Sequence, residues 1–221
     1  MEQRYNQDKH SLLFIIILGM LTAIGPLAID MFLPGLPELK NDFNTTTANA
    51  QLTLSFFMIG LGIGNLFVGP ISDSVGRKKP LIIVMTIFTL ASLGIIFVHN
   101  IWLMIILRLL QGITGGGAAV ISRAIASDLY KGNELTKFLS LLMLVNGVAP
   151  VIAPALGGII LSVAVWRVVF VILTIFGILM VMGSLTKIPE SLSLEYRDSS
   201  GIKVIFQNFK SLLGTPRFVL P

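Results

Sequence analysis

The sequence predicts an all-α integral membrane protein, a bundle of six transmembrane helices. Two observations carry this prediction. Of the 221 residues, 54% are hydrophobic and only 12% are charged, with a mean hydropathy of +0.88, whereas soluble domains carry about 25% charged residues. Long uncharged stretches also follow one another along the chain. The composition excludes a soluble enzyme, a nucleic-acid-binding module and a disordered tail, and the lack of cysteine excludes thiolate metal sites and thiol catalysis.

Six segments are long enough to cross a membrane, since a spanning helix needs about 20 mostly apolar residues. The third and fourth are divided at His99 and Asn100. Arg4 and Lys9 before the first segment would also suit a signal peptide, but its apolar run is long and no small-residue cleavage site follows. The predicted helices cover residues 11–36, 48–71, 80–98, 101–124, 136–162 and 166–186.

The basic residues predict the orientation, because cytoplasmic loops of membrane proteins are enriched in Lys and Arg. With a cytoplasmic N-terminus, the inner segments up to the sixth helix hold eight basic residues and the outer segments hold two. The inner set is Arg4, Lys9, Arg77, Lys78, Lys79, Arg123, Lys131 and Lys137, and the outer set is Lys40 and Arg167. We therefore predict a multi-pass protein of the plasma membrane with its N-terminus in the cytoplasm.

Three regions are predicted from the change in composition after Lys187. Residues 1–187 form the six-helix transmembrane domain, and residues 188–215 form a polar cytoplasmic linker. Within the linker, apolar residues recur at helical spacing from Ile202 to Leu213, which indicates an amphipathic helix on the membrane surface or against the bundle. Residues 216–221 resemble the start of a seventh span, as if the chain were the first half of a larger protein.

A glycine-rich, charged turn separates the second and third predicted helices. Its glycines allow close backbone approach or a positive φ, and its acid and base, four residues apart, are able to pair. An ordinary positive-inside loop would explain the same residues one by one, but their combined spacing is more specific. The residues that define this spacing are Gly69, Asp73, Gly76 and Arg77, followed by Lys78.

This spacing resembles that of the major facilitator superfamily, in which it occupies the loop between helices two and three. The resemblance implies that Asp73 and Arg77 form a conformational latch, joined by an acid at the cytoplasmic end of helix four, here Asp128. The family usually has a basic residue directly after the aspartate, where this chain has Ser74. The latch is therefore expected to be one charge weaker than usual.

The fourth predicted helix places Arg108 inside a span, which costs about 2.5–3.5 kcal/mol on insertion scales. We therefore expect Arg108 to face a polar cavity or a partner, the alternative being a side chain that snorkels outward. Gly112 and Gly116 form a face of small residues that lets a neighbouring helix approach. The R-x-x-Q-G string of Arg108, Gln111 and Gly112 also resembles the superfamily's drug:proton antiporters, in which this arginine is linked to proton coupling.

The fifth predicted helix contains two prolines four residues apart, which remove backbone donors and bend a helix. Glycines around them permit tight packing. The pattern resembles the antiporter motif of the same superfamily, with Ala149 before Pro150 instead of the more common glycine. The residues that carry it are Gly147, Pro150, Pro154, Gly157 and Gly158.

An acid near the end of the first predicted helix completes the set of candidate site residues. If that helix reaches residue 36, Asp30 lies about 9 Å from its outer end, close to the depth of Arg108, about 10 Å. An interfacial helix cap would be the plainer role for Asp30. The string from Asp30 to Pro37 resembles that of Bcr/CflA-type drug exporters, as do Trp166 and Arg167 at the start of the sixth helix.

The resemblance covers the whole chain and implies the N-terminal half of a drug:proton antiporter. Its expected partners are the lipid bilayer, protons, a small lipophilic drug and a missing C-terminal six-helix half, with no nucleic acid, metal or cofactor beyond the proton gradient. Met31, Phe57, Met58 and Met143 would add an adaptable apolar wall. An enzyme is not expected, because the two histidines are isolated at span ends. The alternatives are a uniporter or symporter on the same fold and a truncated bundle that does not transport.

Overall fold

The computed structural model describes residues 12–197, all of them in helices and their connections. The helices are α2 (Leu12–Asp30), η1 (Leu33–Gly35), α3 (Leu36–Asp42), α4 (Thr47–Val75), α5 (Lys78–Ile96), α6 (Ile101–Leu129), α7 (Gly132–Val163), α8 (Arg167–Lys187) and η2 (Leu194–Tyr196). Within this part of the chain, six helical segments are long and apolar enough to cross a membrane. The predicted six-helix, all-α membrane fold is confirmed.

The first predicted helix is wrong at its end, because α2 stops at Asp30 instead of continuing to residue 36. Pro34 explains the break: it has no N–H to donate to the carbonyl oxygen of Asp30, and it disfavours helical backbone in Leu33. The chain turns through a 3₁₀ segment and resumes as α3, so that one broken segment, Leu12–Asp42, forms the first candidate span.

Local signals set several other helix ends. The Thr46 hydroxyl accepts a hydrogen bond from the backbone N–H of Asn49 at 3.2 Å and caps α4. The Asn100 side chain accepts one from the N–H of Trp102 at 2.8 Å and caps α6. Gly76 ends α4 at a φ of +101°, a backbone conformation that favours glycine. Asp73 therefore lies in the last turn of α4, and not in a loop as predicted.

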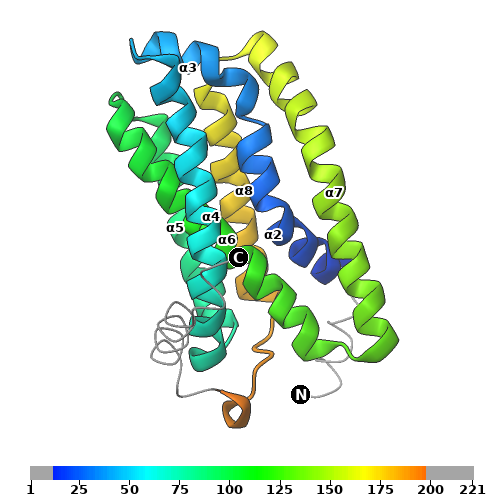
Figure 1. Cartoon of the computed structure of the whole chain (residues 1–221). Helices are drawn as coiled ribbons and strands as arrows, with labels where there is room; N and C mark the ends of the chain where they lie inside the picture. The colour runs from blue at the N-terminus through cyan, green and yellow to red at the C-terminus, as the bar shows by residue number, and fades with distance from the viewer. Residues whose placement is uncertain (1–11, 198–221) are drawn as a thin grey trace, which may run out of the picture.

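The helices run side by side along one bundle, with α3 at the end opposite the α4–α5 turn (Figure 1). The closest pair is α4 and α6; α5 packs on α6 and α8, and α2 packs on α6 and α7. The core is filled by large buried side chains. Its largest fully enclosed members are Trp166, Arg108, Phe14, Phe32, Phe57, Phe88 and Phe170.

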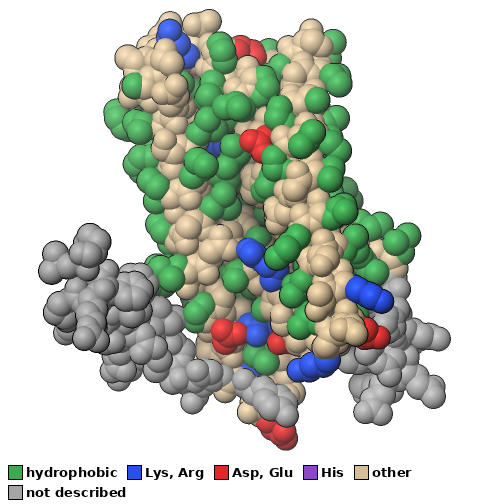
Figure 2. Space-filling view, turned by 45° about the vertical axis from the view of Figure 1, so that its right-hand side comes forward, with side chains coloured by type: hydrophobic (Ala, Val, Ile, Leu, Met, Phe, Trp, Pro, Cys, Tyr) green, Lys and Arg blue, Asp and Glu red, His purple; other side chains and the backbone are tan. Residues whose placement is uncertain are grey.

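The surface is apolar along most of its length, as expected for helices in contact with lipid. Figure 2 shows hydrophobic side chains over the body of the bundle and charged side chains gathered mainly at the end near the grey atoms. Exposed large hydrophobic residues include Met143, Val151 and Val163 on α7 and Ile83 on α5. The predicted amphipathic helix around 202–213 and the predicted start of a seventh span at 216–221 lie outside the described residues.

Candidate functional site

Arg108 lies on α6 with none of its surface exposed. Its Nη1 donates to the carbonyl oxygen of Ala28 at 3.2 Å and to Oε1 of Gln111 at 2.7 Å. Three aromatic rings surround the guanidinium, whose carbon lies 4.3 Å from the ring centroid of Phe57, 5.1 Å from that of Phe32 and 5.5 Å from that of Phe170. These rings stabilise the buried charge by cation–π attraction.

Two polar atoms of Arg108, Nε and Nη2, have no hydrogen-bond partner among the described residues. A buried guanidinium nitrogen without a partner is costly. Of the two settings expected for Arg108, the structure has the partner, because Nη1 bonds to Ala28 and Gln111. It does not have the polar cavity, because aromatic rings close in the side chain. It also differs from the outward-snorkelling alternative, which needs an exposed guanidinium.

A chain of hydrogen bonds fixes Gln111, the predicted companion of Arg108. Nε2 of Gln111 donates to the hydroxyl of Ser92 on α5 at 2.7 Å, and that hydroxyl donates to the carbonyl oxygen of Phe88 at 2.8 Å. Gln111 and Ser92 are both fully buried. The amide therefore has one orientation, with its oxygen toward Arg108. Ser92 was not among the predicted site residues, because a serine in an apolar run is unremarkable in the sequence.

Asp30 is the last residue of α2 and is partly exposed. None of the ion pairs in the described part of the chain joins it to Arg108. The depth argument assumed a continuous helix to residue 36, which the structure does not have. The bond from Arg108 to Ala28 nevertheless places the guanidinium beside the last turn of α2, which carries Asp30. The break in α2 has another effect: the N–H of Phe32 bonds to the carbonyl oxygen of Ile29 at 3.2 Å, and not to that of Ala28 as in a continuous helix. Ala28 is thus free to accept from Arg108.

The structure brings together the three residues of the predicted latch at the α4–α5 turn. Arg77, which is 6% exposed, pairs through Nη1 with Asp73 and through Nε with Oδ2 of Asp128, at 3.0 Å. Its Nη1 also donates to the Ser72 hydroxyl at 2.7 Å. Burial alone lowers the pKa of Arg77, but the hydrogen bonds to the two carboxylates outweigh burial and hold this pKa above its ordinary value.

The segment after α8 completes this cluster. From the sequence, this segment was predicted only to be part of a polar linker. Oε1 of Glu190 accepts from the backbone N–H of Arg77 at 2.7 Å, and its Oε2 accepts from that of Lys78 at 3.3 Å. The Ser191 hydroxyl donates to Oδ2 of Asp128 at 2.8 Å. Glu190 thus caps the N-terminus of α5, where a carboxylate is favoured. A Cβ at Gly76 would lie 2.6 Å from Oε2 of Glu190, so this glycine also makes room for the cap.

Gly69 and Ser74 complete the residues predicted for the turn. Gly69 is buried, and its carbonyl oxygen accepts from the Ser72 hydroxyl at 2.6 Å. Ser74, which stands where the family usually has a basic residue, donates to the carbonyl oxygen of Ile71 within α4 at 2.9 Å.

Glycines form the contact between α4 and α6. A Cβ at Gly112 would lie 3.1 Å from the Cα of Gly60 and overlap the carbonyl oxygen of Phe57, and one at Gly116 would lie 3.1 Å from the Cα of Leu61. The predicted small-residue face of α6 therefore meets a matching one on α4, built on Gly60 and Gly64, which the sequence analysis did not single out. Both faces have glycines four residues apart, the spacing that lets helix backbones approach closely.

The predicted antiporter motif on α7 divides between two faces. Gly157 is buried, and a Cβ there would lie 3.0 Å from the Cα of Met31. Gly147 and Gly158 are exposed, with no atom within 4 Å of such a Cβ among the described residues. Pro150 is exposed and Pro154 partly buried. Gly157 is thus the one fully buried member of the motif in the part of the chain that the structure describes.

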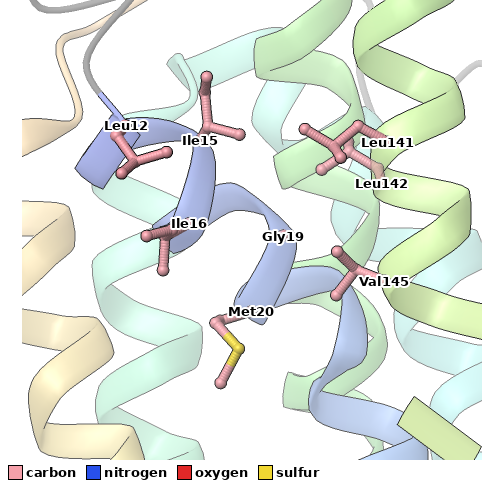
Figure 3. Close-up of a pocket in the computed structure, with 8 residues that line it drawn as sticks. All are labelled: Leu12, Ile15, Ile16, Gly19, Met20, Leu141, Leu142 and Val145. Carbon is pink, nitrogen blue, oxygen red and sulfur yellow. The ribbon is translucent and has the colours of Figure 1, made fainter. Parts of the chain in front are cut away.

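The predicted apolar wall is not gathered in one place. Phe57 and Met31 are buried, whereas Met58 and Met143 are 60% and 73% exposed. A separate apolar pocket of about 250 Å³ lies between α2 and α7, near the α4–α5 end (Figure 3). Its lining is Leu12, Ile15, Ile16, Gly19, Met20, Leu141, Leu142 and Val145. In the described part of the chain, no cluster of three or more acidic or histidine side chains is placed to hold a metal ion.

Comparison with known proteins supplies the family. The model of the Major Facilitator Superfamily matches residues 18–220. An uncharacterised transporter of this type from Bacillus subtilis strain 168 is 42% identical over 96% of this chain and 53% of its own length. A bicyclomycin resistance protein homolog from Haemophilus influenzae is 32% identical over 92% of this chain and 51% of its own length. The chain thus spans about half the length of these relatives.

A solved structure has the same fold. The human organic anion transporter TETRAN superposes with a TM-score of 0.66 at 16% identity, over 91% of this chain and 55% of that one. Three findings point to the same family: the six apolar helices, the turn built on Asp73, Gly76 and Arg77, and the family match over residues 18–220. The chain belongs to the Major Facilitator Superfamily, a family of membrane transporters and not of enzymes.

Proposed function

We propose that the chain is the N-terminal six-helix half of a drug exporter that exchanges protons for small lipophilic compounds. The observation that carries the proposal is the enclosed Arg108, which keeps two nitrogen atoms, Nε and Nη2, without partners beside the broken end of α2. A membrane protein tolerates such a charge mainly where it serves function. The printed name of the Haemophilus influenzae relative, a resistance protein, supports drugs as the substrate class.

Asp30 is the proposed proton carrier. It lies two residues after Ala28, whose carbonyl oxygen accepts a hydrogen bond from Arg108. A shift of this chain segment would therefore change the hydrogen bonding of the guanidinium. Protonation of Asp30 and binding of a drug, often a cation, would exclude each other, and this exclusion couples inward proton flow to outward drug movement. The proton gradient drives the cycle without a bound cofactor.

The latch of Arg77, Asp73 and Asp128 is proposed to hold this half against a second six-helix half while the cavity faces outward. This half carries the α4–α5 turn at the cytoplasmic side of the plasma membrane, as the excess of basic residues at that end favours. The second half is required because transport in this family uses a cavity between two such halves. It is either continuous with this chain or separately encoded.

Asp30→Asn in the full-length protein tests the proposal. Cells are loaded with the lipophilic cation ethidium and its export is followed by fluorescence; inverted membrane vesicles given an acid-inside pH gradient are followed instead for ethidium uptake, which is the same direction of transport. In the Asp30→Asn protein, transport driven by the gradient is expected to fall to the level of cells or vesicles that lack the protein, while the amount of expressed protein stays unchanged. Glu134→Gln, at an exposed acid on α7, is the matched control and is expected to export like the unmodified protein.

Undiminished export by the Asp30→Asn protein would remove Asp30 from the mechanism. Ethidium movement that a protonophore leaves unchanged would favour a uniporter on the same fold. The non-transporting bundle would be favoured by two results together: the unmodified protein does not export ethidium, and the reading frame stops at Pro221 with no second half encoded.

A further inference from the structure

A polar cluster at the α3 end of the bundle fixes Trp166, the residue just before α8. The indole Nε1 of Trp166 donates to Oδ2 of Asp42 at 3.1 Å, and its backbone N–H donates to Oε2 of Glu38 at 3.0 Å. The Trp166 side chain is fully buried, with its ring centroid 5.7 Å from that of Phe43. Two acids of α3 therefore hold one aromatic residue in place.

Arg167 locks the same cluster to α5. It pairs with Asp42, and its Nε and Nη2 donate to the carbonyl oxygens of Ile96 and Val98, each at 3.1 Å. Its guanidinium carbon lies 4.4 Å from the ring centroid of Trp166. We call Glu38, Asp42, Trp166 and Arg167 the α3 clasp; it joins α3, the end of α5 and the start of α8.

The clasp touches the enclosure of Arg108 through aromatic rings. Trp166 packs edge-on against Phe32, with centroids 6.2 Å apart, and against Phe170, at 5.8 Å. Phe32 and Phe170 contact each other at 5.1 Å, and both lie over Arg108. Gly35 lies against the Cβ of Trp166, where an added Cβ would come within 3.3 Å. The turn that carries Phe32 thus rests on Trp166.

Phe32 depends on this support because its own backbone is irregular. It follows the end of α2 and precedes the three-residue η1, so no continuous helix fixes its position. We infer that Trp166 is a positioning residue: held by the α3 clasp, it presses Phe32 over Arg108 and keeps the two unpartnered nitrogen atoms of that arginine closed off from the α3 end. This role deepens the proposed function, since it names what controls access to Arg108.

Chemical labelling of arginines tests the inference without requiring transport. The arginine reagent phenylglyoxal is applied to the purified full-length protein, and mass spectrometry locates and counts the adducts. Arg108 is expected to be unreactive, whereas the exposed Arg123 serves as the internal reference. In the Trp166→Ala protein, labelling of Arg108 relative to Arg123 is expected to rise at least about fivefold, since loss of a local contact raises the open population by such factors.

Two further variants make the test specific. Trp102→Ala removes the other tryptophan, which is 60% exposed, and is expected to leave Arg108 unreactive. Trp166→Phe keeps a ring against Phe32 but loses the hydrogen bond to Asp42, so labelling is expected to lie between those of the unmodified and Trp166→Ala proteins. This variant carries the test if Trp166→Ala does not fold.

Two results would overturn the inference. One is an unreactive Arg108 in both Trp166 variants. The other is a parallel rise in labelling of Arg77, which is buried at the opposite end of the bundle, since that would show general loosening and not a local opening. Failure of ethidium export by the unmodified protein would count against the proposed function alone, because the labelling result does not depend on transport.

Discussion

Gly64→Ala is expected to destabilise the bundle by separating α4 from α6. A Cβ at Gly64 would lie 2.9 Å from the backbone nitrogen of Gly117 and overlap the carbonyl oxygen of Ile113. Both neighbours are backbone atoms, so no side-chain rotation relieves the overlap. The helices must separate by about 1 Å, a gap at which a contact loses roughly a quarter to a half of its dispersion energy.

The expected net effect follows from two opposing contributions. Overpacking costs about 1–3 kcal/mol and occasionally more, and the better helix propensity of alanine returns about 1 kcal/mol. Because the obstacle is backbone, we take the upper part of this range, a net loss of about 1–2 kcal/mol. At roughly 2–4 °C per kcal/mol, the Tm is expected to fall by about 2–8 °C.

Gly62→Ala, two residues away on the same helix, is the matched control. A Cβ at Gly62 meets no atom within 4 Å among the described residues, so only the gain in helix propensity remains. Its Tm is expected to stay level or rise by a few degrees. Thermal unfolding of both purified variants in mild detergent, followed by far-UV circular dichroism, provides the comparison. Equal Tm values, or a more stable Gly64→Ala, would refute the close approach of α4 and α6.

Two other substitutions test polar contacts between distant segments by the same assay. Glu190→Ala leaves two backbone N–H groups at the start of α5 uncapped and is expected to lower the free energy of unfolding by about 1–2 kcal/mol. Its control, Glu195→Ala, changes an exposed acid of the same segment and is expected to leave this free energy unchanged. Equal losses in the two variants would mean that Glu190 is no cap. Ser122→Ala removes a buried hydrogen bond from α6 to the Leu18 carbonyl oxygen of α2 at 2.8 Å and is expected to cost about 0.5–1.5 kcal/mol. Its control, the exposed Ser127→Ala, breaks only a bond within α6, and a loss as large as that of Ser122→Ala would contradict the reasoning.

The number and order of the spans were predictable from the sequence because lipid imposes a simple rule: about 20 apolar residues in a row form a helix. The cluster at the α4–α5 turn was predictable for a different reason. Asp73 and Arg77 are only four residues apart across the turn that ends α4, so local spacing alone brings them together, and Asp128 followed from the resemblance. The roles proposed for these residues stay predictions.

What the sequence analysis missed depends on contacts between distant segments. Gly60 and Gly64 are unremarkable until α6 places its own glycines against them. Glu190 was assigned to a linker because its partners, the N–H groups of Arg77 and Lys78, are more than a hundred residues away. The end of α2 was an avoidable error, since Pro34 marks the helix break by a local rule. The aromatic enclosure of Arg108 draws on α4, α8 and the turn after α2, which no spacing connects.

The attachment of Glu190 and Ser191 beside Arg77 also sets where the chain departs from the bundle. Ile188 and Leu192 are buried as well, so the segment from 188 to 192 is fastened to the bundle and contributes no slack. Within the described residues, the chain is therefore held against the bundle as far as Leu192. If the proposed second six-helix half is attached beyond this segment, holding the chain there shortens the effective tether, which confines that half to a smaller volume and raises its local concentration beside the first.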